Sequence, residues 1–283
     1  TILKLRKIIK EFSPSVVHVH QANSYAYITT KANGGRFPQI ITVWGSDVLR
    51  LPNKGFPYSN MVNYSLSKTD FITVDAHFIK DAIPFISSKK VLVANFGIDY
   101  QPKEFAAKKN YIYSNRLHKP LYRIESIIMG FKEFLVRNPD WKLIVGANGI
   151  LTENLKQLAK EHLPMESCEF IGFVDKKENE KRYMESKIWI SNPESDGTAI
   201  SLLEAMGFGC IPVVSDIPAN REWISSGENG IIIKDSVTAS LEKALSLNLE
   251  ELQNKNKQLI INKATKEVNR DKFISQYEEI ING

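Results

Sequence analysis

The sequence predicts an α/β protein made of two doubly wound domains, each with a parallel sheet. Short runs rich in valine and isoleucine alternate with amphipathic helical patterns along most of the chain. Such alternation is typical of parallel sheets that are covered by helices on both faces. The length of 283 residues also exceeds the size at which a single hydrophobic core usually stops growing. These observations favour two domains over one.

The individual elements follow from the period of the apolar residues. Short apolar runs predict strands at 16–20, 39–44, 70–74, 90–94, 110–114, 141–146, 168–172, 187–191, 211–214 and 230–233. Helical periodicity predicts helices at 1–12, 124–136, 153–162, 177–185 and 271–281. The stretch from Tyr100 to Asn110 contains Pro102 and an Ala-Lys run, and it is typical of a linker. We therefore expect a first domain over 1–105, a second over 106–268 and a final helical segment, 269–283.

Composition excludes several classes of protein. The hydrophobic share of 43% and the charged share of 24% are those of a globular protein. A net charge of +5 favours anionic ligands or an acidic membrane surface without defining either. No apolar run is long enough for a transmembrane helix. The two cysteines, Cys168 and Cys210, form no paired motif and are expected as buried thiols in a reducing compartment.

The strongest chemical pattern is a polar turn between a strand and a helix. Asp196 and Gly197 follow the strand predicted at 187–191, and a helix follows them. The first N–H groups, from Gly197 to Ile200, would form a seat for a phosphate or diphosphate at the strand's carboxyl end. Glu204 follows about two turns later on roughly the same side, where a carboxylate can accept hydrogen bonds from ribose hydroxyls. An ordinary capped core helix is the alternative.

This stretch and its continuation, from Ser195 to Gly230, resemble the retaining nucleotide-sugar glycosyltransferases of family 4, which have the GT-B fold of two Rossmann-like domains facing across a cleft. Members of that family carry an acidic residue, a glycine and a small turn, then Leu-Glu-Ala-Met and a Pro-Val-Val strand. Here Leu203-Glu204-Ala205-Met206 and Pro212-Val213-Val214 occur in that order. The resemblance also implies that the chain, which begins at Thr1, lacks the first part of the N-terminal domain.

The resemblance implies a retaining, metal-independent hexosyltransferase of cell-surface polysaccharide synthesis. Its donor would be a UDP- or GDP-linked sugar, and its acceptor a saccharide or a lipid-linked saccharide. Neither a cofactor nor a nucleic acid is implied, and no Asp-x-Asp motif or His/Cys cluster offers a metal site. A cytoplasmic location follows, with peripheral membrane contact through residues between Arg50 and Tyr64 if the acceptor is lipid-linked. The segment 269–283 would pack back on the first domain.

The donor site implied by the resemblance lies in the second domain. Asp196 and Glu204 would be its catalytic carboxylates, the first near the donor sugar and the second on the ribose. Arg116 matches the diphosphate-binding arginine of the family, whereas the usual lysine is absent and Lys119 or Arg123 would have to replace it. The full donor-binding set is Arg116, Lys119, Gly146, Gly172, Gly197, Thr198, Ala199, Ile200 and Glu204.

Two of these glycines have a structural alternative. Gly146 and Gly172 lie in segments where the backbone of family members approaches the nucleotide. Both could equally belong to tight turns that need glycine for a positive φ.

The acceptor side implied by the resemblance consists of His20, Trp44 and Asp47. Trp44 occupies a position where many family members carry an active-site histidine. Its indole can stack on a sugar face but cannot act as a general base. Asp47 is either a ligand of an acceptor hydroxyl or an N-cap. His20 is either a substrate contact or a packed, hydrogen-bonded histidine.

Two other functions are compatible with the same sequence. One is a different reaction on this scaffold, such as that of a nucleotide-sugar epimerase. The other is a non-catalytic or truncated GT-B subunit that binds nucleotide or a partner without turnover. Trp44, the missing lysine and the missing N-terminal part favour the second alternative.

Overall fold

The computed structural model describes residues 1–83, 90–105 and 107–282, and it divides into two compact units. Unit 1 comprises Thr1–Gly97, Asp196–Thr198 and Lys266–Gly283, and unit 2 comprises Ile98–Ser195 and Ala199–Thr265. The first division therefore follows Gly97, whereas the sequence placed it after residue 105, because the stretch that reads as a linker already belongs to unit 2.

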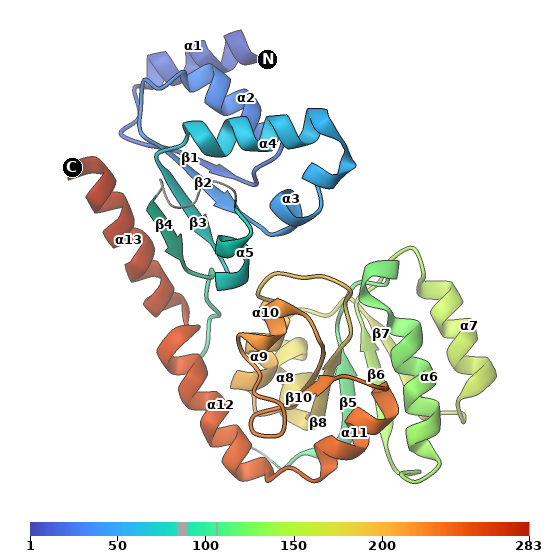
Figure 1. Cartoon of the computed structure of the whole chain (residues 1–283). Coiled ribbons are helices and arrows are strands. Elements are labelled where there is room, and N and C mark those ends of the chain that lie inside the picture. The colour runs from blue at the N-terminus through green and yellow to red at the C-terminus, as the bar shows by residue number, and fades with distance from the viewer. Residues whose placement is uncertain (84–89, 106, 283) are drawn as a thin grey trace. The chain divides into compact units, whose positions relative to one another are not determined.

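The described part of unit 1 is built on a parallel sheet with the strand order β1-β2-β3-β4 (Figure 1). The register places Val19 beside Ile41, Ile41 beside Ile72, and Ile72 beside Val91. One face of the sheet is therefore apolar, since side chains alternate between the two faces of a strand. The strands are β1 (Val17–His20), β2 (Gln39–Val43), β3 (Phe71–Val74) and β4 (Lys90–Val93).

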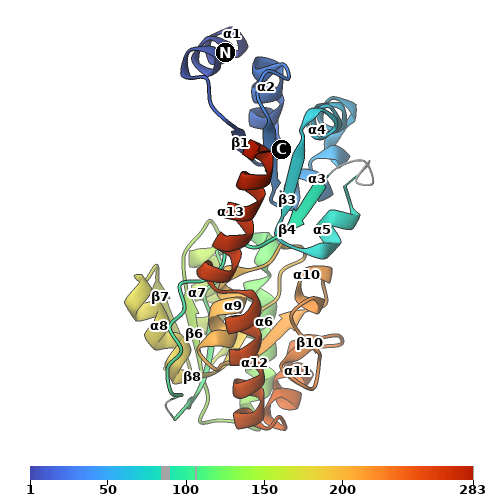
Figure 2. The same cartoon turned by 90° about the vertical axis from the view of Figure 1, so that its left-hand side faces the viewer.

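The two faces of this sheet differ in polarity. Apolar residues of the strands form a core with Ala26 of α2 and Val62 of α4. On the other face, His18 bonds Tyr277 of α13 at 2.5 Å and Thr42 at 2.6 Å, and Figure 2 shows α13 running in front of the sheet. The helices of unit 1 are α1 (Ile2–Phe12), α2 (Ser24–Asn33), α3 (Ser46–Leu49), η1 (Pro52–Lys54), α4 (Phe56–Lys68), α5 (His77–Asp81) and α13 (Lys266–Asn282).

Unit 2 contains a parallel sheet with the order β10-β9-β8-β5-β6-β7. After β5 the chain adds β6 and β7 on one side, and it then returns to add β8, β9 and β10 on the other. The direction of winding therefore reverses between β5 and β8, and such a switch point is where open α/β sheets bind ligands. The strands are β5 (Lys109–Ser114), β6 (Lys142–Gly146), β7 (Cys168–Gly172), β8 (Ser186–Ser191), β9 (Ile211–Ser215) and β10 (Ile231–Ile233).

Helices cover both faces of this second sheet (Figure 1). Ile112 and Ile188 pack with α6, α7 and α11 on one face, whereas Tyr113 and Trp189 pack with α8, α9 and α12 on the other. The sheet is thus buried on both sides, which explains its continuous apolar runs. The helices are η3 (Pro120–Tyr122), α6 (Ile124–Leu135), α7 (Thr152–His162), α8 (Lys176–Glu185), α9 (Ile200–Gly207), α10 (Pro218–Arg221), α11 (Val237–Leu245) and α12 (Leu249–Lys263).

The predicted α/β class is confirmed. All ten predicted strands are present, and their ends differ from the predicted ones by at most one residue. The final helix begins at Lys266 rather than at Asp271, because its first turn is polar and carries no apolar period. Within the described residues, no helix combines the length and apolar character needed to span a bilayer.

Packing of α6 against the sheet of unit 2 gives a stability prediction. Phe131 on α6 is fully buried, whereas Val136 at the end of the same helix is 82% exposed. We expect Phe131→Ala to lower the free energy of unfolding by about 3–5 kcal/mol, because it leaves a cavity. Val136→Ala should change it by less than about 0.5 kcal/mol. Urea denaturation measures both values, and equal effects of the two variants would contradict the packing described.

Candidate functional site

Two loops leave the sheet of unit 2 at its switch point. One follows β5, and the other follows β8 and leads into α9. The two strands are neighbours in parallel register, with Tyr113 beside Trp189, so their carboxyl ends lie side by side. Helix α9 begins at Ile200 with Ala199 as its N-cap, and no side chain caps it. The first amides of α9 thus lie at the switch point without a side-chain acceptor at the cap position.

Glu204 lies on α9 and is held by donors from α8. Its carboxylate accepts a hydrogen bond from the Tyr183 hydroxyl at 3.0 Å and a longer one from the Asn179 amide at 3.4 Å. Tyr183 is fully buried, so its ring fixes the position of the hydroxyl. Glu204 is itself half-buried. The protein therefore orients this carboxylate and leaves it partly accessible to a ligand.

A chain of hydrogen bonds connects Glu204 to the centre of the sheet. The Trp189 indole N–H on β8 donates to Asn115 Oδ1 at 2.9 Å, and Asn115 Nδ2 donates to the Tyr183 hydroxyl at 2.7 Å. Tyr183 then donates to Glu204. Asn115 and Tyr183 each have a partner on either side, and these bonds restrict the rotamers of all four residues. The loop after β5 and the helix after β8 are thereby coupled within unit 2.

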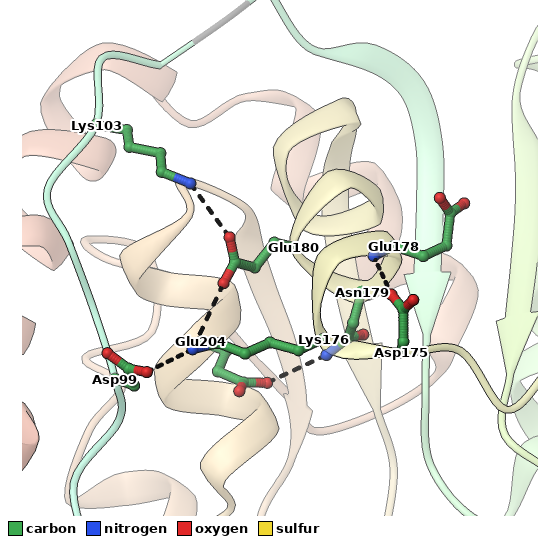
Figure 3. Close-up of polar contacts among 8 residues, drawn as sticks. All are labelled: Asp99, Lys103, Asp175, Lys176, Glu178, Asn179, Glu180 and Glu204. Carbon is green, nitrogen blue, oxygen red and sulfur yellow. Dashed lines mark hydrogen bonds and ion pairs between the residues drawn. The ribbon is translucent and has the colours of Figure 1, made fainter.

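Charged groups around Glu204 form a network on the same side of unit 2 (Figure 3). Lys176 pairs with Asp99 at 2.5 Å and lies 4.0 Å from Glu180, which also pairs with Lys103 at 3.2 Å. Burial raises the pKa of Glu204 above its ordinary value, and the bond from Tyr183 opposes this rise. The ionised carboxylate is therefore less favourable here than in water.

Arg116, in the loop after β5, reaches the first turn of α9. Its guanidinium donates to the Ser201 hydroxyl at 2.7 Å and lies 4.5 Å from the centre of the Tyr122 ring. A cation near a helix N-terminus is unfavourable, because the helix dipole is positive at that end. An anion bound between the guanidinium and the amides would remove this repulsion. The pair of Arg116 and α9 therefore suits a phosphate group.

The amides that precede α9 already have carboxylate partners. The Gly197 N–H donates to the side chain of Asp196 at 3.1 Å, and within unit 1 the Thr198 N–H donates to Asp75 at 3.2 Å. The sequence predicted these two amides as free donors, and in this structure that prediction is wrong. Both partners are anions, which is the charge that the sequence predicted for a ligand there.

Gly146 and Gly172 have structural reasons to be glycine. Gly172 has a φ of +67°, and its carbonyl accepts a hydrogen bond from Ala147 at 2.7 Å. A Cβ on Gly146 would lie only 3.1 Å from the Tyr113 hydroxyl. Gly172 therefore fits the tight-turn alternative. Gly146 has no positive φ, so that alternative is wrong for it, and the nearby Tyr113 hydroxyl is what limits a side chain there. Lys119 is exposed at the end of the loop after β5.

Several residues that shape this site carried no recognisable sequence signal. Asn115, Asn179 and Tyr183 act through partners far away in the sequence, so no local spacing marks them. His118 is buried and bonds Thr152 at 2.8 Å and the carbonyl of Gly146 at 3.1 Å, which fixes the loop after β5. Burial lowers its pKa.

The remaining candidates in unit 2 are the second arginine and the cysteines. Arg123 donates to the carbonyls of Asn192 and Pro193 and so braces the loop after β8. Cys168 and Cys210 are both free, but Cys168 is only half-buried, because it lies in the outermost strand, β7. Residues 1–83, 90–105 and 107–282 contain no group of three His, Cys, Asp or Glu side chains arranged to hold a metal ion.

The acceptor-side residues predicted from the sequence lie together in unit 1. The His20 and Trp44 rings are 6.2 Å apart, and Phe96 lies 5.1 Å from Trp44 and 6.1 Å from His20. Trp44 is 45% exposed and Phe96 39% exposed, so both offer aromatic surface to a ligand. Phe96 was not among the acceptor-side residues that the sequence predicted. The three rings form an aromatic cluster in which Trp44 and Phe96 are tilted to each other and Trp44 meets His20 edge-on.

Asp47 is a buried carboxylate that joins two loops of unit 1. It accepts hydrogen bonds from the backbone N–H groups of Ala22 at 2.6 Å and Trp44 at 3.1 Å. The N-cap of α3 is Gly45, two residues earlier, so the N-cap alternative for Asp47 is wrong. Burial raises the pKa of Asp47, while the backbone bonds lower it.

Two family models match the chain. Residues 98–267 match the model described as glycosyl transferases group 1, and residues 1–76 match the model described as glycosyl transferase 4-like. An uncharacterized glycosyltransferase of Haemophilus influenzae is 30% identical over 112 residues, which are 38% of this chain and 31% of that protein.

Solved structures share the fold over nearly the whole chain. The pneumococcal O-GlcNAc transferase GtfA, in complex with UDP and GlcNAc, has a TM-score of 0.81 at 15% identity, covering 99% of this chain and 60% of that one. Anabaena Alr3699/HepE, in complex with UDP, has a TM-score of 0.82 at 11% identity, and the match covers 98% of this chain and 82% of that one. The predicted pair of Rossmann-like domains of the GT-B type is thus confirmed. The chain spans less than two thirds of the Haemophilus protein and of GtfA.

The raised pKa of Glu204 gives a stability prediction with a definite sign. A folded-state pKa above the unfolded value means that the folded protein holds the proton more tightly, so stability is lost as the pH rises through these values. Glu204→Gln removes this loss. We expect it to raise Tm by a few degrees at about pH 7.5 and to leave Tm unchanged at about pH 3.5, below both values.

A matched control for this variant lies on α8. Glu178 pairs with Arg182 at 2.7 Å, and Figure 3 shows its side chain directed away from Glu204. Glu178→Gln removes the same charge together with a favourable ion pair, so it should bring no rise in Tm. Thermal unfolding across the pH range measures both variants. A Glu204→Gln protein no more stable than the wild type at neutral pH would contradict this description of the site.

Proposed function

Because the chain belongs to the glycosyl transferases group 1 family, we propose that it transfers a sugar from a nucleotide diphosphate sugar to a saccharide acceptor. One observation carries the proposal: Glu204 lies on α9, and Arg116 bonds Ser201 in the first turn of the same helix, at the switch point of unit 2. A carboxylate oriented for hydroxyl groups and a guanidinium beside uncapped helix amides match a ribose joined to a diphosphate. GtfA and HepE, which share the fold, were solved with UDP.

In this proposal each donor group meets a residue of suitable chemistry. Glu204 accepts hydrogen bonds from the ribose hydroxyls, and Tyr183 holds it in place. Arg116 and the amides of Ala199 and Ile200 bind the diphosphate of a UDP- or GDP-sugar. Asp196 contacts hydroxyls of the donor sugar. These roles are the ones that the family resemblance implies, and the hydrogen bonds described above orient Glu204 and Arg116.

The proposed reaction is a retaining hexosyl transfer. The bond between the anomeric carbon and the donor phosphate oxygen breaks, and the acceptor oxygen bonds to the same carbon on the same face. The proton of the acceptor hydroxyl passes to the leaving phosphate. This scheme requires neither a metal nor a general base at Trp44. The anomeric configuration of the product, measured by NMR, tests retention directly.

The biological setting that we propose is the synthesis of a cell-surface polysaccharide at the cytoplasmic face of the membrane. The acceptor would then be a saccharide or a lipid-linked saccharide. Phe56, at the start of α4, is 81% exposed, and Tyr58 is 45% exposed. Exposed aromatic rings favour a peripheral lipid contact. Sedimentation with vesicles tests this contact.

A second candidate is a non-catalytic subunit that binds nucleotide without turnover. The observation that favours it is Trp44, which stands where many relatives of this type carry a histidine. Incubation of the full-length protein with labelled UDP- and GDP-sugars separates the candidates. Transfer to an acceptor supports the enzyme, whereas nucleotide binding with no transfer supports the subunit. Donor consumption without an acceptor would indicate an epimerase.

The role of Glu204 predicts the effect of its removal on nucleotide affinity. We expect Glu204→Ala to weaken UDP or GDP binding at least tenfold, or about 1.4 kcal/mol. Isothermal calorimetry measures the affinity, and Glu178→Ala on α8 serves as the control with unchanged affinity. Equal affinities of the Glu204→Ala and wild-type proteins would refute the ribose assignment.

The role of Arg116 predicts a different pattern. Arg116→Ala should weaken the binding of the nucleoside diphosphate about tenfold or more, because a charge-assisted hydrogen bond is lost. The affinity for the nucleoside alone should not change, since it carries no phosphate. Glu204→Ala, by contrast, should weaken both ligands. If Arg116→Ala weakens the nucleoside equally, the arginine supports the fold of the site and does not bind the diphosphate.

A further inference from the structure

A polar cavity of about 400 Å³ lies in unit 1, outside the nucleotide site proposed for unit 2. Its volume is within the range of small-molecule sites. Its lining comes from the loop after β1 and from the segment after β2 that contains α3 and η1. The lining residues are Gln21, Asn23, Ser46, Asp47, Arg50, Leu51 and Lys54. We name this space the unit 1 cavity.

The position of the unit 1 cavity is that of a ligand site. Strand β1 ends at His20 and β2 ends at Val43, and the two strands are parallel neighbours. Their carboxyl ends therefore lie at one edge of the sheet, where parallel sheets bind ligands. The cavity adjoins this edge, because Gln21 is the first residue after β1.

The backbone at the cavity is strained and firmly held. Gln21 has a φ of +73°, a left-handed conformation that costs a side-chain-bearing residue about 1–3 kcal/mol. Its N–H donates to the carbonyl of Thr42 at 2.8 Å, and its Oε1 accepts a hydrogen bond from Asn23 at 2.7 Å. Strain that is held in this way concentrates at ligand sites.

The charges of the lining are unbalanced. Asp47 is 5% exposed, and the N–H groups of Ala22 and Trp44 already stabilise its carboxylate. Arg50 and Lys54 are exposed, and neither side chain forms an ion pair within the described part of the chain. Among the described residues, the cavity thus presents two cations that form no ion pair with a carboxylate.

We propose that the unit 1 cavity binds an anionic group of the acceptor, a phosphate or a sugar carboxylate, through Arg50 and Lys54. The inference rests on the proposed function, which supplies the acceptor. A guanidinium binds either group with two parallel hydrogen bonds, and an ammonium adds a point charge. Asn23 and Ser46 supply polar groups for the hydroxyls of the same sugar. The acceptor is therefore an acidic saccharide or a sugar phosphate.

The lining favours a discrete ligand over a lipid surface. A membrane attracts basic residues through its surface potential and needs no cavity. Here the two cations share a concave lining with Asn23, Ser46 and the buried Asp47, and such convergent polar groups select a small molecule.

The test uses a double variant of the full chain, Arg50→Gln/Lys54→Gln, in which both positive charges are removed. The matched control, Lys4→Gln/Lys10→Gln, removes the same charge from exposed positions of α1. Glucuronic acid, glucose 6-phosphate and glucose are the probes, and calorimetry or ligand-observed NMR gives their affinities. Circular dichroism and Tm establish that all proteins are folded.

We expect at least one anionic sugar to bind the wild type and the control more tightly than glucose does. The double variant should bind that sugar at least tenfold more weakly, while its affinity for UDP stays that of the wild type. Selective binding of glucose 6-phosphate identifies a phosphate as the anionic group, and selective binding of glucuronic acid identifies a carboxylate.

Three outcomes overturn the proposal. In the first, the anionic sugars bind the double variant as tightly as they bind the wild type. In the second, the control loses as much affinity as the double variant. In the third, neither anionic sugar binds the wild type more tightly than glucose does. In the third case, phosphatidylglycerol vesicles that bind only the wild type would assign the two cations to a membrane. A wild type that binds neither UDP nor GDP would refute the proposed function. The affinities for the anionic sugars would then still decide whether the unit 1 cavity binds an anion.

Discussion

The parallel pairing of β5 with β8 is the constraint on which the proposed nucleotide site depends. Strand order reverses at this pair, so two chain segments far apart in the sequence leave the sheet at the same edge. The loop after β5 brings Asn115 and Arg116 to α9, and the segment after β8 brings α9 itself. Any change that shifted this register would move the guanidinium and the carboxylate apart, whatever the local sequence of either segment.

Much of the fold and part of the site could be predicted from sequence. The strands were predictable because a sheet buried on both faces requires continuous apolar runs, as in Ile188-Trp189-Ile190. Glu204 was found because its spacing from Asp196 belongs to a local motif. Tyr183 could not be found in this way, because its function arises only when α8 packs beside α9. Its sequence position is that of any buried aromatic residue.

The errors have a common physical origin. Gly197 and Thr198 were expected to present free amides, but short-range and tertiary carboxylates bind them. The boundary between the units was placed on a polar, proline-containing stretch, although Tyr100 within it is buried and bonds the carbonyl of Gly207 at 2.7 Å. In both cases local composition described the backbone correctly and could not reveal its tertiary partners.

Unfavourable electrostatics are concentrated where a ligand is expected. Glu204 is a carboxylate whose ionisation burial opposes, and Arg116 is a cation near the positive end of a helix. A nucleoside diphosphate offers the complementary groups, hydroxyl donors for the first and negative charge for the second. The same reasoning applies to unit 1, where two exposed cations lie beside a strained loop. Interactions that are unfavourable without a ligand are therefore the best physical guide to what each unit binds.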